Sequence, residues 1–300
     1  MSLSISVITP SYNQGQFIER TIQSVLCQGI PGLEYMVCDG GSKDETVSIL
    51  RRYQDRLRWL SEPDRGQAHA VNKGIEATSG DIIGWLNSDD IYYPGALRTV
   101  LDFFEKYPDV EVVYGDGNHI GINDEVIEPY YTEDWDYERL KDVCYLCQPA
   151  VFFRRRVVEQ FGNLDESLYF CLDYEYWLRL GATRPFVRLD KLLAGSRMYE
   201  DNKTMAGRVA FHREIVHMMQ KRLGRTPDRW MFNYAHARID AKGYQRETAP
   251  GRVRYISLLV LLSTFYFLCW EHRLPASARR TMMEWIREPL FQSLKEAWGR

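Results

Sequence analysis

The first ninety residues alternate short apolar runs with segments of helical periodicity, and this alternation limits the folds that the chain can adopt. Ser42 and Glu45 fit a capping box at the start of one of these helices. Strands joined by crossover helices form a parallel sheet, so the loops that follow them gather at one edge. The pattern predicts strands at 5–9, 33–38, 58–60 and 82–86, and helices at 17–27, from 42 onward and at 68–77.

After residue 92 the pattern becomes mixed, and after residue 207 it is helical. Pro250 and Gly251 give the clearest linker signal of the chain, at 248–251. We therefore expect an α/β part followed by a helical extension. In the mixed part we expect helices at 95–107 and 173–180 and strands at 110–114 and 148–153.

Composition, the N-terminal residues and the cysteines argue against a nucleic-acid-binding protein, a secreted protein and a disulfide scaffold. Charged residues make up 26% of the 300 residues, hydrophobic ones 45%, and the net charge of −3 gives no general attraction to nucleic acid. The N-terminus lacks the basic start and apolar core of a signal peptide, so we expect a cytoplasmic protein. The six cysteines are scattered, which favours reduced thiols. Cys144 and Cys147 could form half a zinc site or a redox pair, but packing is the favoured interpretation.

The stretch 255–270 is almost entirely apolar. It is shorter than the roughly 20 residues that cross a bilayer. Arginines lie on both sides of it, which would suit a helix at an anionic membrane surface. The favoured interpretation is a buried helix that packs against the last amphipathic segment, whose apolar residues are Met282, Met283, Trp285, Ile286, Leu290 and Phe291.

Acidic residues follow the predicted strands. The apolar strand at 82–86 ends in Asn87, Ser88, Asp89 and Asp90. Carboxylate and amide oxygens there suit a hard divalent cation, which can also bind a diphosphate. The alternative is a turn whose polar side chains cap backbone groups. Two further acids, Asp39 and Asp64, follow other strands and would lie at the same edge of the sheet.

These motifs together resemble family-2 glycosyltransferases of the GT-A fold. The resemblance covers roughly residues 3–206 and implies a Rossmann-like, mostly parallel mixed sheet flanked by helices. It divides the chain into a glycosyltransferase domain at 1–206, with a nucleotide-binding half at 1–92 and an acceptor half at 93–206, and a helical extension at 207–300. The motifs are Thr9–Asn13, Asp39–Ser42, Glu62–Gln67, Asn72–Gly74, Trp85–Asp90, Gln148–Pro149, Phe161–Glu166, Leu172–Leu178, Ser196–Arg197 and Asn202–Thr204.

The resemblance also implies roles for individual residues on the donor side. Asp89 keeps the position that binds Mg²⁺ or Mn²⁺ in this family. The chain departs from the family at Asn87, where the metal motif has Asp, and at Tyr199, where the family often has His. The residues expected to bind the nucleotide-sugar are Pro10, Ser11, Tyr12, Asp39, Asp64, Asn87, Ser88 and Asp89.

On the acceptor side, Asp173 matches the family's catalytic base. Taken alone, Asp173 could also be the N-cap of a helix. Glu175 is the reserve candidate for the base, although support of the site or contact with the acceptor is favoured for it. Gln148 and Asp90 are also expected to contact the acceptor.

The implied activity is inverting transfer of a sugar, most simply from a UDP-sugar, to a glycan or lipid-linked saccharide of a bacterial surface polysaccharide. The resemblance suggests a location at the cytoplasmic face of the membrane. Residues 252–300 would make the peripheral contact with it. Two alternatives remain open: a sugar nucleotidyltransferase, although the chain lacks its Gly-rich loop, and a degenerate sugar-binding protein.

Overall fold

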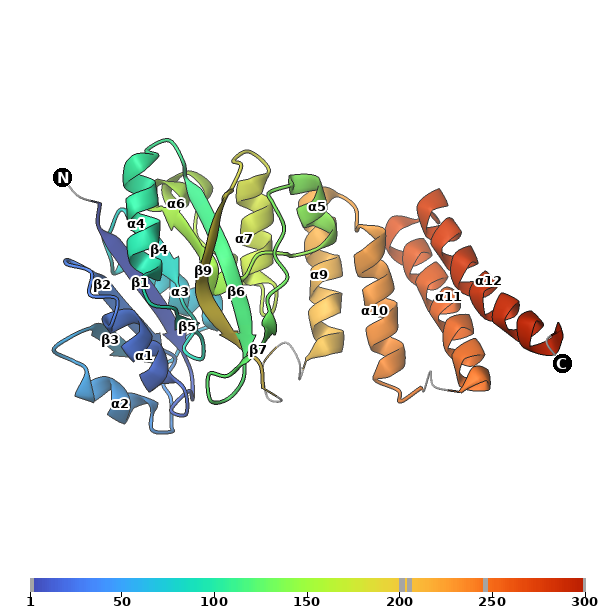
Figure 1. Ribbon diagram of the computed structural model, residues 1–300, viewed down its shortest axis with the longest axis horizontal. Coiled ribbons are helices and arrows are strands. Elements are labelled where there is room, and N and C mark those ends of the chain that lie inside the picture. The colour runs from blue at the N-terminus through green and yellow to red at the C-terminus, as the bar shows by residue number, and fades with distance from the viewer. Residues whose placement is uncertain (1–2, 200–202, 204–206, 245–247, 299–300) are drawn as a thin grey trace. The chain divides into compact units, whose positions relative to one another are not determined.

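The computed structural model describes residues 3–199, 203, 207–244 and 248–298 (Figure 1). Its internal contacts divide the chain into two units, Met1–Asn202 and Lys203–Arg300. The domain boundary predicted at 206 lies outside the described residues.

The first unit is built on one mixed sheet. Its strands are β1 (Ile5–Ser11), β2 (Glu34–Asp39), β3 (Arg58–Ser61), β4 (Ile82–Trp85), β5 (Ile91–Tyr92), β6 (Val112–Ile120), β7 (Val126–Pro129), β8 (Val151–Arg154) and β9 (Val187–Arg197). Its helices are α1 (Ile18–Leu26), α2 (Thr46–Arg52), α3 (Gln67–Glu76), α4 (Ala96–Lys106), α5 (Tyr137–Asp142), α6 (Arg155–Phe161) and α7 (Leu172–Gly181).

The strand order is β3-β2-β1-β4-β8-β6-β9-β5, with β7 on β6. The first four strands run parallel, as the strand–helix alternation predicts. Strand β8 then pairs antiparallel with both β4 and β6, and this reversal makes the sheet mixed. The predicted parallel and mixed character is therefore confirmed, and the reversal at β8 opens the carboxyl end of β4 to the second half of the unit.

Helices cover both faces of this sheet because alternate residues of each strand point to opposite sides. Ile5 and Val7 of β1 belong to a core cluster with apolar residues of α1, α2 and α4. On the other face, Ile8 of β1 lies against Gly74 of α3, and Phe153 of β8 contacts the rings of α7. The sheet is thus buried on both sides, which leaves its carboxyl edge as the place for a site.

Three local predictions are wrong. Ser42 does not cap α2, whose N-cap is Glu45, because the Ser42 hydroxyl is bonded to Asp39 instead. The segment predicted as one strand at 148–153 begins with a 3₁₀ turn, Gln148–Ala150. The predicted linker at 248–251 is the start of a helix, where the Thr248 hydroxyl accepts a hydrogen bond from the Gly251 amide (3.2 Å) and Pro250 fits the first turn.

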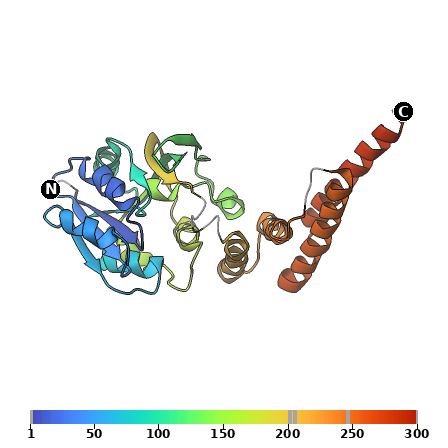
Figure 2. The same ribbon diagram turned by 90° about the horizontal axis from the view of Figure 1, so that it is seen from below.

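The second unit is helical, as predicted, and Figure 2 shows its last two helices from the side. Its helices are α9 (Arg208–Leu223), α10 (Asp228–Asp240), α11 (Ala249–Glu271) and α12 (Ala276–Trp298). Helix α10 packs against both α9 and α11, and α11 packs against α12. The helix that contains the apolar stretch has 23 residues, longer than the sixteen predicted, because it extends past that stretch at both ends.

The packing of α3 on β1 leaves no room at Gly74. A Cβ at this position would lie 2.3 Å from Cγ2 of Ile8. In an open helix, replacing Gly by Ala stabilises by about 0.5–1 kcal/mol. Here we expect Gly74→Ala to lower the free energy of unfolding by about 1–3 kcal/mol, as overpacking does, measured by urea denaturation.

A double-mutant cycle supplies the control. Ile8→Ala removes the atom that a new Cβ would meet, so Gly74→Ala should cost less in that background than in the wild type. Equal costs in both backgrounds would show that the two residues do not limit each other.

Candidate active site

The carboxyl ends of the parallel strands form one row. In the sheet register Ser11 of β1 pairs with Asp39 of β2, and Asp39 pairs with Ser61 of β3. Pro10, next to Ser11, pairs with Cys38. The hydroxyl Oγ of Ser11 is buried and has no hydrogen-bond partner among the described residues. A buried hydroxyl without a partner is costly, so this end of β1 is suited to a polar ligand.

Asp39 is fully buried and organises the loop that follows β2. Its Oδ2 accepts hydrogen bonds from the amides of Gly41 (3.1 Å) and Ser42 (2.9 Å) and from the hydroxyl of Ser61 (2.6 Å). Its Oδ1 accepts from the Ser42 hydroxyl. The carboxylate therefore fixes the shape of this edge, and its predicted contact with a nucleobase stays a prediction.

Tyr12 and Asp64 meet over Gly40. A Cβ on Gly40 would lie 2.8 Å from Oδ2 of Asp64 and 3.3 Å from the ring of Tyr12, so only glycine leaves both in place. The other Asp64 oxygen accepts from the Gly66 amide (2.8 Å), while the Tyr12 side chain is 61% exposed. An exposed ring beside a partly exposed carboxylate can stack on a base and accept its N–H.

The side-chain amide of Asn87 connects four parts of the site. Its Oδ1 accepts from Nε2 of Gln67 (2.7 Å) and Nε1 of Trp85 (3.0 Å). Its Nδ2 donates to Oδ2 of Asp90 (3.2 Å) and Oε1 of Gln148 (2.9 Å). Two of these partners are acceptors, so the network needs a donor that a carboxylate at position 87 could not supply. The network at position 87 therefore uses both the acceptor and the donor of a side-chain amide.

The two acids after Asn87 differ in their surroundings. Asp90 is buried and accepts from the amide of Arg197 (2.8 Å). Burial and the nearby Asp89 carboxylate raise the pKa of Asp90 well above its usual value. Asp89 is partly exposed, and its Oδ2 accepts from the Tyr199 hydroxyl (3.0 Å). Desolvation raises the pKa of Asp89, and the hydrogen bond from Tyr199 opposes this. Of the two acids, Asp89 is the one that a ligand can reach.

Arg197 fixes the position of the Asp89–Asp90 turn through buried contacts. Its side chain is fully buried, lies 4.8 Å from the Phe17 ring centroid and forms an ion pair with Asp124. Its Nε donates to the backbone carbonyl of Asp89 (2.6 Å), and Nη1 donates to the carbonyl of Ile122 (3.2 Å). In the sequence Arg197 stands out only as part of a motif, and its buried role has no local signal because these hydrogen-bonding partners are more than seventy residues away.

The turn is also tied to α1. The Thr21 hydroxyl is placed to donate to the carbonyl oxygens of Ser88 (2.9 Å) and Asp90 (2.7 Å). The side chain of Ser88 itself is buried. Ser88 therefore contributes to the shape of the turn, and its predicted contact with the donor stays a prediction.

Asp173 comes from the second half of the unit. Its neighbourhood includes Tyr130, whose pKa is raised well above its usual value by burial, then by Cys144 and Cys147, and less by Asp173 and Asp90. Asp173 lies in the first turn of α7 after the N-cap Cys171, so the N-cap interpretation of Asp173 is wrong.

Gln148 and Glu175 are both engaged within the protein. Nε2 of Gln148 donates to the carbonyl of Trp85 (2.7 Å), which joins the 3₁₀ turn to β4. Glu175 is 1% exposed and its Oε2 accepts from Nη2 of Arg179 (2.9 Å). These contacts give both residues supporting roles, and their predicted contacts with an acceptor stay predictions.

The residues at the end of β4 can hold a hard cation through one carboxylate. No group of three or more His, Cys, Asp and Glu side chains within the described residues is arranged to hold a metal ion. The side-chain amide of Asn87 is fully hydrogen-bonded within the protein. Asp90 accepts hydrogen bonds from the Asn87 amide and the Arg197 backbone, so Asp89 would be the protein ligand. A cation there would complete an oxygen sphere with the diphosphate and water. This donor set fits Mg²⁺ or Mn²⁺.

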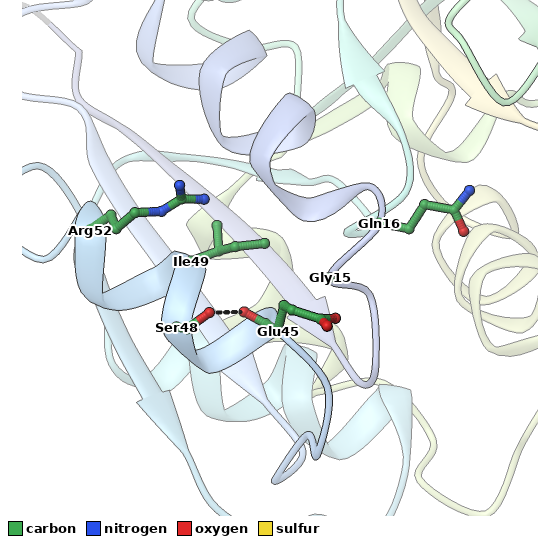
Figure 3. Close-up of a pocket in the computed structure, with 6 residues that line it drawn as sticks. All are labelled: Gly15, Gln16, Glu45, Ser48, Ile49 and Arg52. Carbon is green, nitrogen blue, oxygen red and sulfur yellow. Dashed lines mark hydrogen bonds between the residues drawn. The ribbon is translucent and has the colours of Figure 1, made fainter.

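Two other features do not include predicted site residues. Burial raises the pKa values of the Cys144 and Cys147 thiols, which accords with packing roles. A surface hollow of about 540 Å³ lies between the loop before α1 and helix α2, and Figure 3 shows the residues that line it. The hollow is lined by Gly15, Gln16, Glu45, Ser48, Ile49 and Arg52, none of which is a predicted site residue.

Comparison with known proteins identifies this arrangement. Residues 6–162 match the family model of glycosyl transferase family 2. The chain is 29% identical over 228 residues to a chondroitin synthase of Escherichia coli, covering 73% of this chain and 33% of that protein. It is 27% identical over 214 residues to an uncharacterised glycosyltransferase of Rickettsia typhi, covering 67% of this chain and 65% of that protein. The chain thus spans less than two thirds of each relative.

Solved structures share the fold at low sequence identity. S. aureus TarS 1–349 in complex with UDP-GlcNAc has a TM-score of 0.60 at 16% identity, covering 99% of this chain and 93% of that one. A mannosyltransferase from Pyrobaculum calidifontis in complex with GDP-Man and Mn²⁺ has a TM-score of 0.58 at 17% identity, covering 98% and 82%. The predicted GT-A fold with its C-terminal helices is confirmed.

The amide at position 87 gives a test of the site's construction. We expect Asn87→Asp to lower the free energy of unfolding by about 2 kcal/mol or more, because a carboxylate would face the acceptors on Asp90 and Gln148. The measurement is urea denaturation. Asn123→Asp makes the same chemical change on an exposed side chain and should have little effect. Equal stability of Asn87→Asp and wild type would contradict the network.

Proposed function

Because the chain belongs to glycosyl transferase family 2, we propose that it moves a sugar from a nucleotide-sugar donor to a saccharide acceptor with inversion at the anomeric carbon. The observation that carries the proposal is the family match over residues 6–162, with the partly exposed Asp89 after β4 and Asp173 in the first turn of α7. The turn of Asp89 and Asp90 belongs to the donor side, and Asp173 belongs to the acceptor side. A single displacement needs one group on each side of the reacting carbon.

On the donor side, the chain's residues bind and orient the nucleotide. Tyr12 offers an exposed ring for stacking, and Asp64 offers a carboxylate oxygen beside it. The unpartnered hydroxyl of Ser11 lies at the end of the same strand row. A carboxylate only accepts hydrogen bonds, so it suits the imide N–H of uracil, and we propose a UDP-sugar as donor.

Asp89 would hold Mg²⁺ or Mn²⁺, and the bound ion would offset the charge of the leaving diphosphate. The rest of the turn keeps Asp89 in position. Arg197 binds its backbone carbonyl, and the Tyr199 hydroxyl binds its Oδ2. Tyr199 replaces a nitrogen ligand of the family by a hydroxyl, which favours a coordination sphere made of oxygen.

On the acceptor side, Asp173 would take the proton of the attacking hydroxyl. Asp173 lies in the first turn of α7 and is partly exposed. Removing this proton as the oxygen attacks makes the acceptor a stronger nucleophile. Because no second nucleophile is assigned, the acceptor oxygen attacks the anomeric carbon directly. A single displacement of this kind inverts the anomeric configuration.

The acceptor and location form part of the same proposal. Relatives named chondroitin synthase and hyaluronan synthase match two thirds or more of this chain, which supports a saccharide acceptor. We propose a glycan or lipid-linked saccharide on the cytoplasmic face of a membrane, with peripheral contact through 252–300. The family match favours transfer of a sugar over the two alternatives, a nucleotidyltransferase and a degenerate binding protein.

The donor proposal predicts metal-dependent nucleotide binding. UDP-sugars should raise the Tm of the wild type when Mn²⁺ is present, because a ligand that binds only the folded state stabilises it. EDTA should remove most of this shift, and Asp89→Ala should lose it while its Tm without ligand stays near that of the wild type. An unchanged shift for Asp89→Ala would show that Asp89 does not hold the metal. If only GDP-sugars raise the Tm, the donor carries guanine and the proposal of a UDP-sugar is wrong.

The base proposal predicts a large effect of one conservative change. Asp173→Asn should lower kcat by roughly 10²- to 10⁴-fold, the usual contribution of a general base, and leave donor affinity nearly unchanged. Glu175→Gln is the matched control, since Glu175 lies on the same helix but is paired with Arg179. Near-wild-type turnover in Asp173→Asn would remove the base role from this residue. Product NMR that shows retained configuration would overturn the single displacement.

A further inference from the structure

Helix α11 exposes an apolar stripe. Leu261 is 66% exposed, Phe265 57% and Leu268 51%. Their spacing of four and three residues places them on one side of the helix. Val253 (52% exposed) lies near the start of the same helix. A helix that shows several large apolar side chains on one side is unusual for a face in contact with water alone.

Helix α12 also combines exposed apolar and cationic side chains. Met283 is 50% exposed and Ile286 is 42% exposed. The side chains of Arg279, Arg280 and Arg287 are exposed on the same helix. Six of the fourteen large hydrophobic side chains exposed in the described part of the chain lie between residues 253 and 286. The two helices therefore hold a concentration of exposed apolar residues.

The charge of this segment is opposite to that of the rest of the chain. Residues 249–287 contain six arginines and two glutamates, whereas the whole chain has a net charge of −3. Of the two glutamates, Glu271 accepts a hydrogen bond from the Thr226 amide (2.6 Å) and lies partly buried. Arg252 and Arg254 precede the apolar stripe and Arg273 follows it, all three exposed. Such a distribution complements a surface that is apolar inside and anionic at its boundary.

The opposite side of α11 packs against other helices of the second unit. Tyr255, Leu259 and Phe267 belong to the core cluster of the second unit. The Tyr255 hydroxyl donates to Oδ1 of Asp240 (2.7 Å), and Oγ1 of Thr264 lies 3.7 Å from Sδ of Met282. The stretch Gly251–Glu271 is long and apolar enough to cross a membrane, with a mean hydropathy of 1.6, but these contacts cover one side of it. A helix fixed in this way presents one face, which suits lying on a bilayer.

The predicted burial of this segment is therefore only partly correct. Met282 is buried and Trp285 packs on the core cluster, as expected. Met283 and Ile286 are exposed instead, and only 28% of the apolar window of α11 is buried. The side chains of Leu290 and Phe291 lie outside the described residues.

We propose that the exposed faces of α11 and α12 bind the surface of an anionic phospholipid bilayer. The apolar stripe enters the boundary between headgroups and acyl chains, and the exposed arginines of the two helices and of the turn between them bind lipid phosphates. This gives the membrane contact of the proposed function a defined surface, and it rests on that function only for its biological purpose. The binding itself requires no sugar transfer.

A second copy of the chain is the other occupant to consider. In a symmetric dimer the same patch meets itself, so the arginines of one copy would approach those of the other. Like charges that meet in an interface oppose association. The charge of these helices therefore favours an anionic lipid surface over a self-complementary dimer.

Vesicle sedimentation of the full chain tests the proposal. We expect binding to phosphatidylcholine vesicles that contain phosphatidylglycerol, and at least about tenfold weaker binding to phosphatidylcholine alone or at raised salt. Replacing Leu261, Phe265 and Leu268 together by Ser should weaken binding by about tenfold or more. Replacing Arg279, Arg280 and Arg287 together by Gln should have a similar effect and should also reduce the salt dependence.

Matched variants on the first unit serve as controls. Val126, Ile127 and Leu192 are 57%, 56% and 45% exposed, so their triple replacement by Ser removes as many exposed apolar side chains and should leave vesicle binding unchanged. Equal binding by the α11 variant and the wild type would overturn the proposal. So would a dimer, seen by light scattering without vesicles, that the α11 replacement converts to monomer. Because no donor is present, these results do not depend on the transferase reaction.

Discussion

The structure of the site depends on how two neighbouring carboxylates are kept at the end of β4. Burial in an apolar core solvates a carboxylate poorly and raises the pKa values of both Asp89 and Asp90, and the charge of Asp89 raises that of Asp90 further. The chain meets this constraint by giving the two acids different partners. Asp90 turns inward to the Asn87 amide and the Arg197 backbone, whereas Asp89 turns toward Tyr199 at the accessible side. One acid becomes part of the framework and the other remains reachable for a ligand.

This division accounts for the side chains at positions 87 and 199 together. An amide at position 87 removes a third negative charge and supplies the N–H groups that Asp90 and Gln148 need. A tyrosine at position 199 supplies a hydroxyl donor to the remaining acid. Both side chains act on the two acids through hydrogen bonds. The turn is thereby fixed by the protein itself, and the cation is left to the single carboxylate and the donor's own phosphates.

Sequence patterns predicted the elements of the fold well where a local rule governs them. Period-two and helical patterns placed β1, β2, α1 and α3 because burial of one face depends on nearby residues alone. The errors arose where a hydrogen-bonding partner outside the expected motif competes with a local rule. Ser42 looks like a cap, but Asp39 binds its hydroxyl, and Gln148 looks like part of a strand, but Trp85 and Asn87 hold it in a 3₁₀ turn. The site acids were visible in sequence, whereas the partner that keeps Asp90 inward, Arg197, lies 107 residues away.

The same reasoning separates two kinds of apolar helix that sequence cannot distinguish. A run such as 255–270 shows its apolar character on every side, so periodicity does not tell which side is covered. The structure decides this through polar contacts at the edges of the buried face, such as the hydrogen bond from Tyr255 to Asp240. These contacts fix the rotation of α11 about its axis and thereby select Leu261, Phe265 and Leu268 as the exposed side. The buried sides of α11 are apolar because they pack in the core cluster of the second unit. The exposed side has no such partner within the described part of this unit, so its apolar residues are available for contact with another surface.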